Sequence, residues 1–417
     1  MWTKELRRHK GRTLATAAAV GTATALLVSM LAISEGIIST VESQIADSEA
    51  DLLVGAPFNT NFPDGRSIAA NISAWAEVNF TSPTLEGLVS IRSGKAGTAN
   101  MTPVAVGVVP GPFFEILPER DRALFQGWFR EPGDPHFEGN YTGPWTGEVV
   151  ISRELAESLA VSRNETVQVA RRAGEAGRPF TVVGIADPEL SPDRIIQDVR
   201  IAFFHLSELQ DLSGEAFEGE GGTGPVADRV SRLYISLEGA ARATPGAADA
   251  VKQRVEDAYP DFAGMVSTKR ERLERLQDEY AVARVFYTAI GFVSLVIGLL
   301  FVGCIVVISV SERTRDIGAL RAIGVSRRSI FLMILGEAVV LVLAGALAGV
   351  LPAYLAAQAL GNYVAASQGV APTLIGFGPT LVLESLARVV LVGALISLYP
   401  AWRATRVPVI EALNARA

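Results

Sequence analysis

Cysteine and histidine are almost absent from this sequence. Cys304 is the only cysteine, so no disulfide can form within the chain, and any folded domain must be held by its own hydrophobic core. The three histidines, at positions 9, 136 and 205, are too few and too scattered to build a metal site. Without paired cysteines or clustered histidines, we predict no metal centre.

The motifs of common catalytic and nucleotide-binding sites are also missing. No G-x-S-x-G or H-E-x-x-H run occurs. Gly94-Lys95 resembles the end of a Walker A loop, but Val89 stands where the first glycine should be and Ala96 replaces the magnesium-binding Ser or Thr. We therefore predict no catalytic residue, no cofactor and no enzyme activity in this sequence.

Long apolar runs without charge are the most informative feature that is present. Four such runs occur, at 14–33, 285–311, 338–383 and 389–402. About 20 apolar helical residues cross the hydrocarbon core of a bilayer. We therefore predict four transmembrane helices, at 13–34, 284–310, 330–357 and 379–401.

Charge is divided between the segments that the predicted spans separate. Residues 35–283 hold 22 basic and 38 acidic residues, a net charge of −16, whereas the rest of the chain has a net charge of +9. Basic segments stay cytoplasmic. We therefore expect the N-terminus (1–12), the loop 311–329 and the tail (402–417) inside, with 35–283 and the loop 358–378 outside. A cleaved signal peptide is the alternative for the first span.

The long outer segment predicts a mixed α/β domain. Strands are expected at 148–152, 166–170, 180–185, 200–204 and 232–237, and helices at 153–159 and 247–259. Residues 270–283 predict a charged helix that continues into the second span as a stalk. The predicted fold class is thus an α-helical membrane protein with four transmembrane helices and an inserted mixed α/β extracytoplasmic domain.

Five Asn-x-Ser/Thr sequons fall within this outer segment. Glycosylation would suit an extracytoplasmic position, but chance in a polar segment is the preferred explanation of the set. The five asparagines are Asn71, Asn79, Asn100, Asn140 and Asn164.

The loop between the second and third spans predicts a short amphipathic helix over 312–324. Ile317, Leu320 and Ile323 are spaced to share one face, and Gly324 is placed to end the helix. Ser326 is placed to cap the next helix. Such a helix can lie flat on a membrane or dock in a partner's groove, and periodicity does not choose between these roles.

Two motifs resemble those of the MacB/FtsX/LolC-type ABC permease superfamily. Residues 312–325, Glu-Arg-Thr-Arg-Asp-Ile-Gly-Ala-Leu-Arg-Ala-Ile-Gly-Val, resemble that family's E-R-x-R-E-I-G-x-L-R-A-[LI]-G-[AV] run, with Asp316 in place of its glutamate. The tail from Tyr399 to Leu413 resembles the family's P-A-x-R-A-x-x-x-x-P-[VI]-E-A-L-R ending, with Asn414 in place of the final arginine. The order of one span, a large domain and three spans is also similar.

This resemblance implies a permease subunit of an ABC transporter in the cell membrane, with both termini cytoplasmic. Its loop helix would couple to a separate ATPase subunit, which binds the ATP, and a second copy of the chain would complete a homodimer. An extracytoplasmic adaptor or substrate protein is a further partner, and no nucleic acid is implied. The coupling residues would be Glu312, Arg313, Arg315, Asp316, Ile317, Leu320, Arg321, Ile323 and Gly324.

The same resemblance leaves two functions open. One is export or extraction of a lipophilic, peptide or lipoprotein substrate, driven by movement of the outer domain. The other is transmission of a signal to an extracellular cell-wall enzyme, as in FtsX, without transport.

A few residues within the predicted spans suggest helix packing rather than transport. Gly345 and Gly349 form a GxxxG motif that permits close packing, either within the chain or in a dimer. Glu337 is expected to serve packing or the interface, and Glu384 with Arg388 predicts an i,i+4 ion pair.

Overall fold

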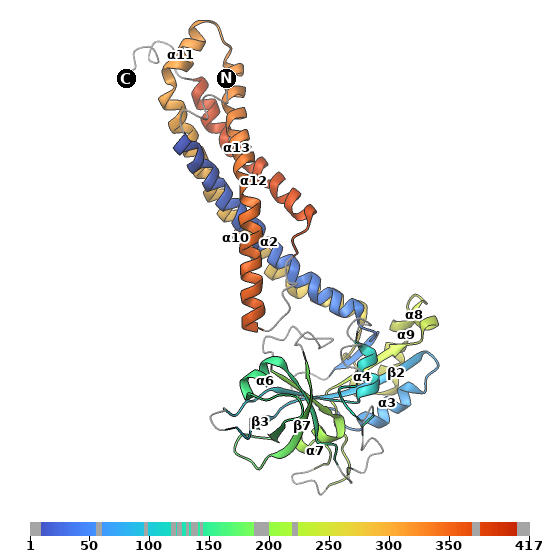
Figure 1. Cartoon of the computed structure of the whole chain (residues 1–417). Coiled ribbons are helices and arrows are strands. Elements are labelled where there is room, and N and C mark those ends of the chain that lie inside the picture. Colours follow the sequence, from blue (N-terminus) through green and yellow to red (C-terminus); the bar gives the residue numbers. More distant parts are fainter. Residues whose placement is uncertain are drawn as a thin grey trace. The chain divides into compact units, whose positions relative to one another are not determined.

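The computed structural model describes residues 10–55, 61–95, 99–117, 122, 127–130, 133–134, 141, 145–186, 200–218, 224–368 and 376–406. The chain divides into two compact units (Figure 1). We call 1–40, 278–363 and 372–417 the helical unit, and 41–277 with 364–371 the α/β domain.

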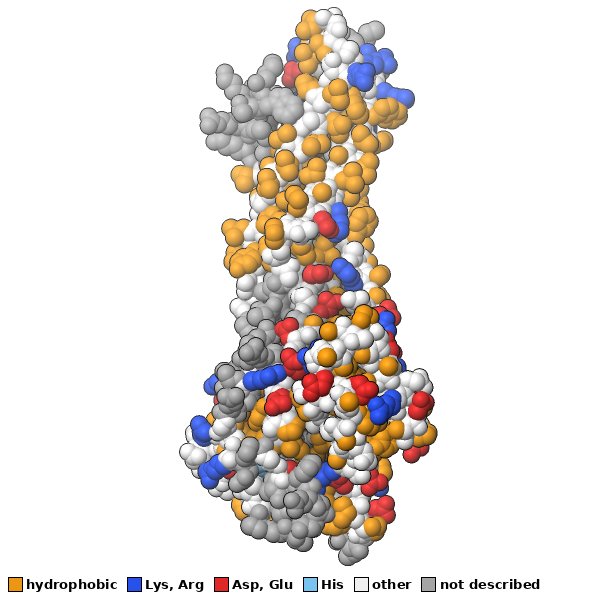
Figure 2. All heavy atoms as spheres, turned by 90° about the vertical axis from the view of Figure 1, so that its right-hand side faces the viewer, with side chains coloured by type: hydrophobic (Ala, Val, Ile, Leu, Met, Phe, Trp, Pro, Cys, Tyr) orange, Lys and Arg blue, Asp and Glu red, His pale blue; other side chains and the backbone are white. Residues whose placement is uncertain are grey.

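The helical unit contains long apolar helices. Their bounds are α2 Lys10–Asp47, α10 Lys269–Glu312, α12 Arg327–Gln368 and α13 Pro379–Thr405, with the short α11 Thr314–Ala322 between α10 and α12. The four long helices are long and apolar enough to cross a membrane, and each contains one predicted span. On the face seen in Figure 2, hydrophobic side chains cover the helices of this unit.

The long helices extend beyond the predicted spans. α10 begins at Lys269, so the predicted helix 270–283 and the second span form one continuous helix. α12 continues to Gln368, which makes the expected loop at 358–378 too long by eleven residues. The reason is composition: residues 353–360 are rich in alanine and leucine, and the single Gly361 costs only about 1 kcal/mol in a helix.

The GxxxG motif packs α12 against α2 of the same chain. A Cβ on Gly345 would lie 2.7 Å from the Cβ of Val20, and one on Gly349 would lie 3.0 Å from both the Cα of Gly21 and the Cβ of Thr24. Separations this short leave no room for a side chain at either glycine. The motif therefore serves the fold within one chain.

The α/β domain is built on a ten-stranded mixed sheet of order β10-β1-β9-β2-β4-β8-β5-β7-β6-β3. The strands are β1 Leu52–Gly55, β2 Val78–Leu88, β3 Ser90–Ser93, β4 Val104–Val108, β5 Glu148–Ser152, β6 Thr166–Ala170, β7 Arg178–Ala186, β8 Ile201–His205, β9 Arg232–Leu237 and β10 Val266–Thr268. The helices are α3 Gly65–Ser73, α4 Pro110–Ile116, α6 Arg153–Leu159, α7 Leu206–Ser213, α8 Gly239–Arg242 and α9 Ala247–Ala258, with a 3₁₀ turn at Pro260–Phe262.

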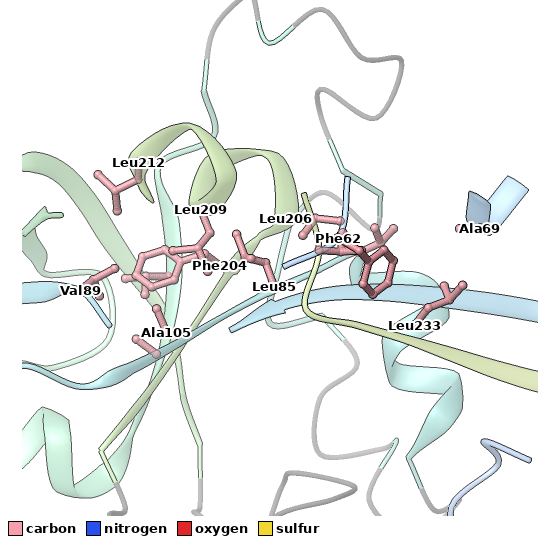
Figure 3. Packing of buried hydrophobic residues seen from close by; sticks show 14 of the residues in the cluster. Phe62, Ala69, Leu85, Val89, Ala105, Phe204, Leu206, Leu209, Leu212 and Leu233 are labelled. Atoms are coloured by element: carbon pink, nitrogen blue, oxygen red, sulfur yellow. The ribbon is translucent and has the colours of Figure 1, made fainter. Parts of the chain in front are cut away.

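Strand β8 shows that both faces of this sheet are covered. Successive side chains of a strand point to opposite faces. Phe204 belongs to the larger hydrophobic cluster and Phe203 to a second cluster, so each face has its own core. In the larger cluster, Leu206 and Leu209 from α7 pack beside Phe204 and Leu85 (Figure 3).

A buried polar cluster fixes the first turn of α3. The backbone N–H of Arg66 donates to Asp228 Oδ2 at 2.7 Å, and its guanidinium donates to Ser207 Oγ at 2.8 Å and Gln210 Oε1 at 3.0 Å. The Tyr141 hydroxyl donates to Asp228 Oδ1 at 3.1 Å. Burial raises the pKa of Tyr141 above its ordinary value, which keeps this hydroxyl protonated.

Candidate functional site

The segment between α10 and α12 forms the short helix that the sequence predicts. α10 ends at Glu312, α11 runs over Thr314–Ala322, and Gly324 has a φ of +96°. Glycine adopts this left-handed conformation at little cost, so it ends the helix. Ser326 Oγ accepts the backbone N–H of Ser329 at 3.1 Å and caps α12. The predicted helix end at Gly324 and the predicted helix cap at Ser326 are both confirmed.

The three residues of the predicted apolar face of α11 differ in burial. Ile317 is only 4% exposed and packs in the core of the helical unit with Ile330 and Ile334, while Leu320 is half-buried. Ile323, in contrast, is 79% exposed. Periodicity identified the three apolar residues, but it did not show that the helical unit of the same chain buries Ile317 and leaves Ile323 exposed.

The exposed face of α11 combines charge with small and apolar side chains. An α-helix turns by about 100° per residue, which places its exposed side chains within one arc of roughly 120°. These are Arg315, Asp316, Ala319, Ala322 and Ile323, which we call the α11 outer face. Glu312, at the end of α10, is exposed as well.

Two polar contacts, one from Arg313 directly before α11 and one from Arg321 within it, join this segment to the spans that follow it. Arg313 Nη1 lies 3.3 Å from Glu337 Oε2 on α12. Arg321 Nη1 donates to the backbone carbonyl of Thr405 at 3.4 Å, in the last turn of α13. The sequence analysis placed both arginines in the site but did not predict these partners. The segment 313–322 thus has direct polar contacts with both α12 and α13.

A second set of contacts lies in the α/β domain, where α2 ends and α10 begins. Lys269 Nζ donates to the carbonyls of Ser48 at 2.5 Å and Ala46 at 3.2 Å, and Arg272 Nη2 donates to the carbonyl of Ala50 at 2.8 Å. These side chains thus donate to one carbonyl in the last turn of α2, where intrahelical partners are lacking, and to two carbonyls just beyond it. The two segments that connect the domain to the spans are thus joined side by side.

The sequence analysis missed this junction, although its sequence contains a signal. Thr268 and Glu271 form a capping box at the start of α10: Thr268 N–H donates to Glu271 Oε2 at 3.0 Å, and Glu271 N–H donates to Thr268 Oγ1 at 3.2 Å. The Ser/Thr-x-x-Glu pattern predicts a helix start. It would have placed the first turn of α10 at Lys269.

The remaining predicted residues fall at the surface. Glu384 and Arg388 form the expected ion pair on α13 at 2.9 Å. Lys95, rejected as a nucleotide-binding lysine, pairs with Glu165 at 2.8 Å. Among the sequons, Asn140 lies outside the described residues. The other four asparagines, Asn71, Asn79, Asn100 and Asn164, are exposed.

Comparison with protein families decides the identity of both units. Residues 13–258, more than half of the chain, match the family model of the MacB-like periplasmic core domain, and 288–409 match the FtsX-like permease C-terminal model. The chain belongs to the MacB/FtsX-type ABC permease family. It is thus a multi-pass membrane protein with an extracytoplasmic core domain, and α11 lies within the FtsX-like region.

Curated relatives are longer proteins of the same family. The macrolide export ATP-binding/permease protein MacB of Nitrobacter winogradskyi is 35% identical over 246 residues, covering 56% of this chain and 34% of that protein. MacB of Brucella melitensis is 24% identical over 100% of this chain and 60% of its own length. The pyoverdine export ATP-binding/permease protein PvdT of Pseudomonas putida is 25% identical over 98% and 58%. The chain spans at most about three-fifths of these relatives.

A solved structure of the family gives a distant match. The crystal structure of the periplasmic region of MacB from Actinobacillus actinomycetemcomitans is 11% identical, covers 56% of this chain and 95% of that chain, and gives a TM-score of 0.35.

Proposed function

We propose that this permease couples ATP hydrolysis by a partner ATPase to movement of its extracytoplasmic domain, for export or extraction of a lipophilic, peptide or lipoprotein substrate. The observation that carries the proposal is the α11 outer face. This exposed helix surface lies between the membrane-spanning helices α10 and α12 in the sequence. Polar contacts join its segment to α12 and to α13.

In this proposal, α11 and both termini lie in the cytoplasm. Four spans and an extracytoplasmic domain after the first span give this arrangement. Arg315, Arg327 and Arg328 on or beside α11 agree with it, because basic loops are retained inside. The ATPase would therefore reach α11 from the side where ATP is available.

The route of the signal outward would be α10. This helix is continuous from Lys269 to Glu312, so it contains both the end that adjoins α11 and the turn that holds the end of α2. A second copy of the chain would complete the complex in the bilayer, and an adaptor or substrate protein would meet the outer domain.

An FtsX-like signal transmitter is the second candidate. Long charge-free runs in the spans favour it, because an aqueous path for a polar substrate needs polar side chains along it. In that case the outer domain would activate an extracellular cell-wall enzyme and nothing would cross. The two candidates share the coupling step and differ in whether a substrate is moved.

Substitution of Ile323 by Asp tests the coupling step. The new carboxylate would be desolvated against the ATPase, which should weaken binding by at least about tenfold. Because Ile323 is exposed in the free chain, folding and insertion should not change. The measurement is ATPase activity in the complex purified through a tag on the permease from its native membranes.

The matched control is Val226→Asp, which adds the same charge at an exposed apolar residue of the α/β domain. It should retain the ATPase. If Ile323→Asp retains as much ATPase as this control does, the α11 outer face is not the docking surface.

A further inference from the structure

α11 and the first turns of α12 form a closed helical hairpin. The turn at 323–326 joins them at one end. Ile317, Ile330 and Ile334, which lie between these ends, belong to one hydrophobic cluster. The Arg313–Glu337 ion pair closes the other end, where Glu337 lies ten residues, or about 15 Å, along α12.

The ion pair joins two residues that are far apart in the sequence, so the turn between the helices does not by itself bring them together. The two residues are 24 positions apart, and their side chains are partly buried, with 22% of Arg313 and 33% of Glu337 exposed. Glu337 stands on a membrane-spanning helix, where an unpaired carboxylate is costly. Separation of α11 from α12 would leave this charge without Arg313.

We propose that Glu337 is a positioning residue that makes α11 and α12 move as one body. The proposal rests on the coupling function above and describes how one of its steps works. α11 cannot rotate away from α12 without breaking the Arg313–Glu337 pair. Arg321 adds a weaker contact, a single hydrogen bond to the Thr405 carbonyl at the end of α13. Motion applied to the α11 outer face is thereby passed to α12 first.

A packing role for Glu337 alone makes a different prediction. A residue that only fills space would tolerate an isosteric amide and would gain nothing from exchange of the two charges. A positioning ion pair loses its effect in Glu337→Gln and regains it when Arg313→Glu and Glu337→Arg are combined. The exposed Glu384–Arg388 pair on α13 supplies a matched control, Glu384→Gln.

Hydrogen exchange of the full chain in lipid nanodiscs measures this directly. In Glu337→Gln, amides of α11 should exchange about five- to tenfold faster than in the unmodified chain, the ratio expected when a partly buried ion pair that opposes local opening is lost. Amides of α13 should be unchanged. The charge-exchanged double variant should restore slow exchange, and Glu384→Gln should leave α11 unaffected.

Unchanged exchange in Glu337→Gln, or no recovery in the double variant, would overturn the positioning role. If the single variant fails to insert, recovery of insertion and slow exchange in the double variant decides the question instead. The experiment contains no ATPase. Failure of the proposed coupling function would appear as loss of ATPase binding in the Ile323 experiment and would leave this result intact.

Discussion

At the scale of single residues, Asp228 does more in the α/β domain than its position in an irregular segment suggests. It accepts the backbone N–H of Arg66, pairs with the Arg66 side chain at 3.3 Å, and accepts from Tyr141 and Gln210. Asp228 also has a φ of +41°, and the φ values of Asp64 and Tyr141 are positive too. Backbone strain of this kind persists only where surrounding contacts impose it.

Substitution of Asp228 by Asn should therefore destabilise the domain by about 3 kcal/mol, because it leaves the buried Arg66 guanidinium with less compensating charge. Asparagine tolerates the same backbone conformation, so strain is not added. Urea unfolding of the full chain in detergent, followed by tryptophan fluorescence, measures the change. Glu165→Gln, at the exposed Lys95 pair, should leave stability nearly unchanged, because solvent screens this pair. Equal effects of the two substitutions would contradict the role given to Asp228.

At the scale of elements, the sequence predicted those strands and helices whose bounds depend on local residue patterns. β5, α6, β6 and β9 have the predicted bounds, and β8 is displaced by one residue. β1 and β10 could not be predicted, because β10 has three residues and β1 pairs with strands about 180 and 210 positions later. The Gly324 end of α11 and the Ser326 cap of α12 depend on local sequence and were predicted. The burial of Ile317 and the partner of Arg313 depend on α12, so the pattern of α11 alone could not supply them.

The contact between α2 and α12 gives the prediction at this scale. Gly349→Leu would place a large side chain against the backbone of Gly21. Overpacking of this kind costs typically 1–3 kcal/mol even in cores that can adjust, and two helix backbones adjust poorly. We expect a reduced yield of folded chain in detergent, measured by size-exclusion chromatography. Leu351→Ala, at an exposed residue of the same helix, should be neutral. A normal yield for Gly349→Leu would show that the helices separate easily.

At the scale of the whole molecule, the positions of charge and of apolar helices predict a topology that labelling can test. Cys304 is first replaced by Ser, and single cysteines are placed at Ser162 of the α/β domain or Arg315 of α11, both of which are exposed. A membrane-impermeant maleimide added to intact cells should modify position 162 only. Both positions should react after the membrane is opened. Labelling of position 315 in intact cells would place α11 outside and exclude the proposed ATPase contact.

The glycine contact between α2 and α12 also limits how lipids meet this protein. Where the backbones of Gly21 and Gly349 lie closer than a methyl group would allow, no acyl chain can enter between the two helices. At the depth of this contact, the space between α2 and α12 is therefore closed to lipid. At that depth, a lipophilic molecule could enter this bundle only between another pair of helices.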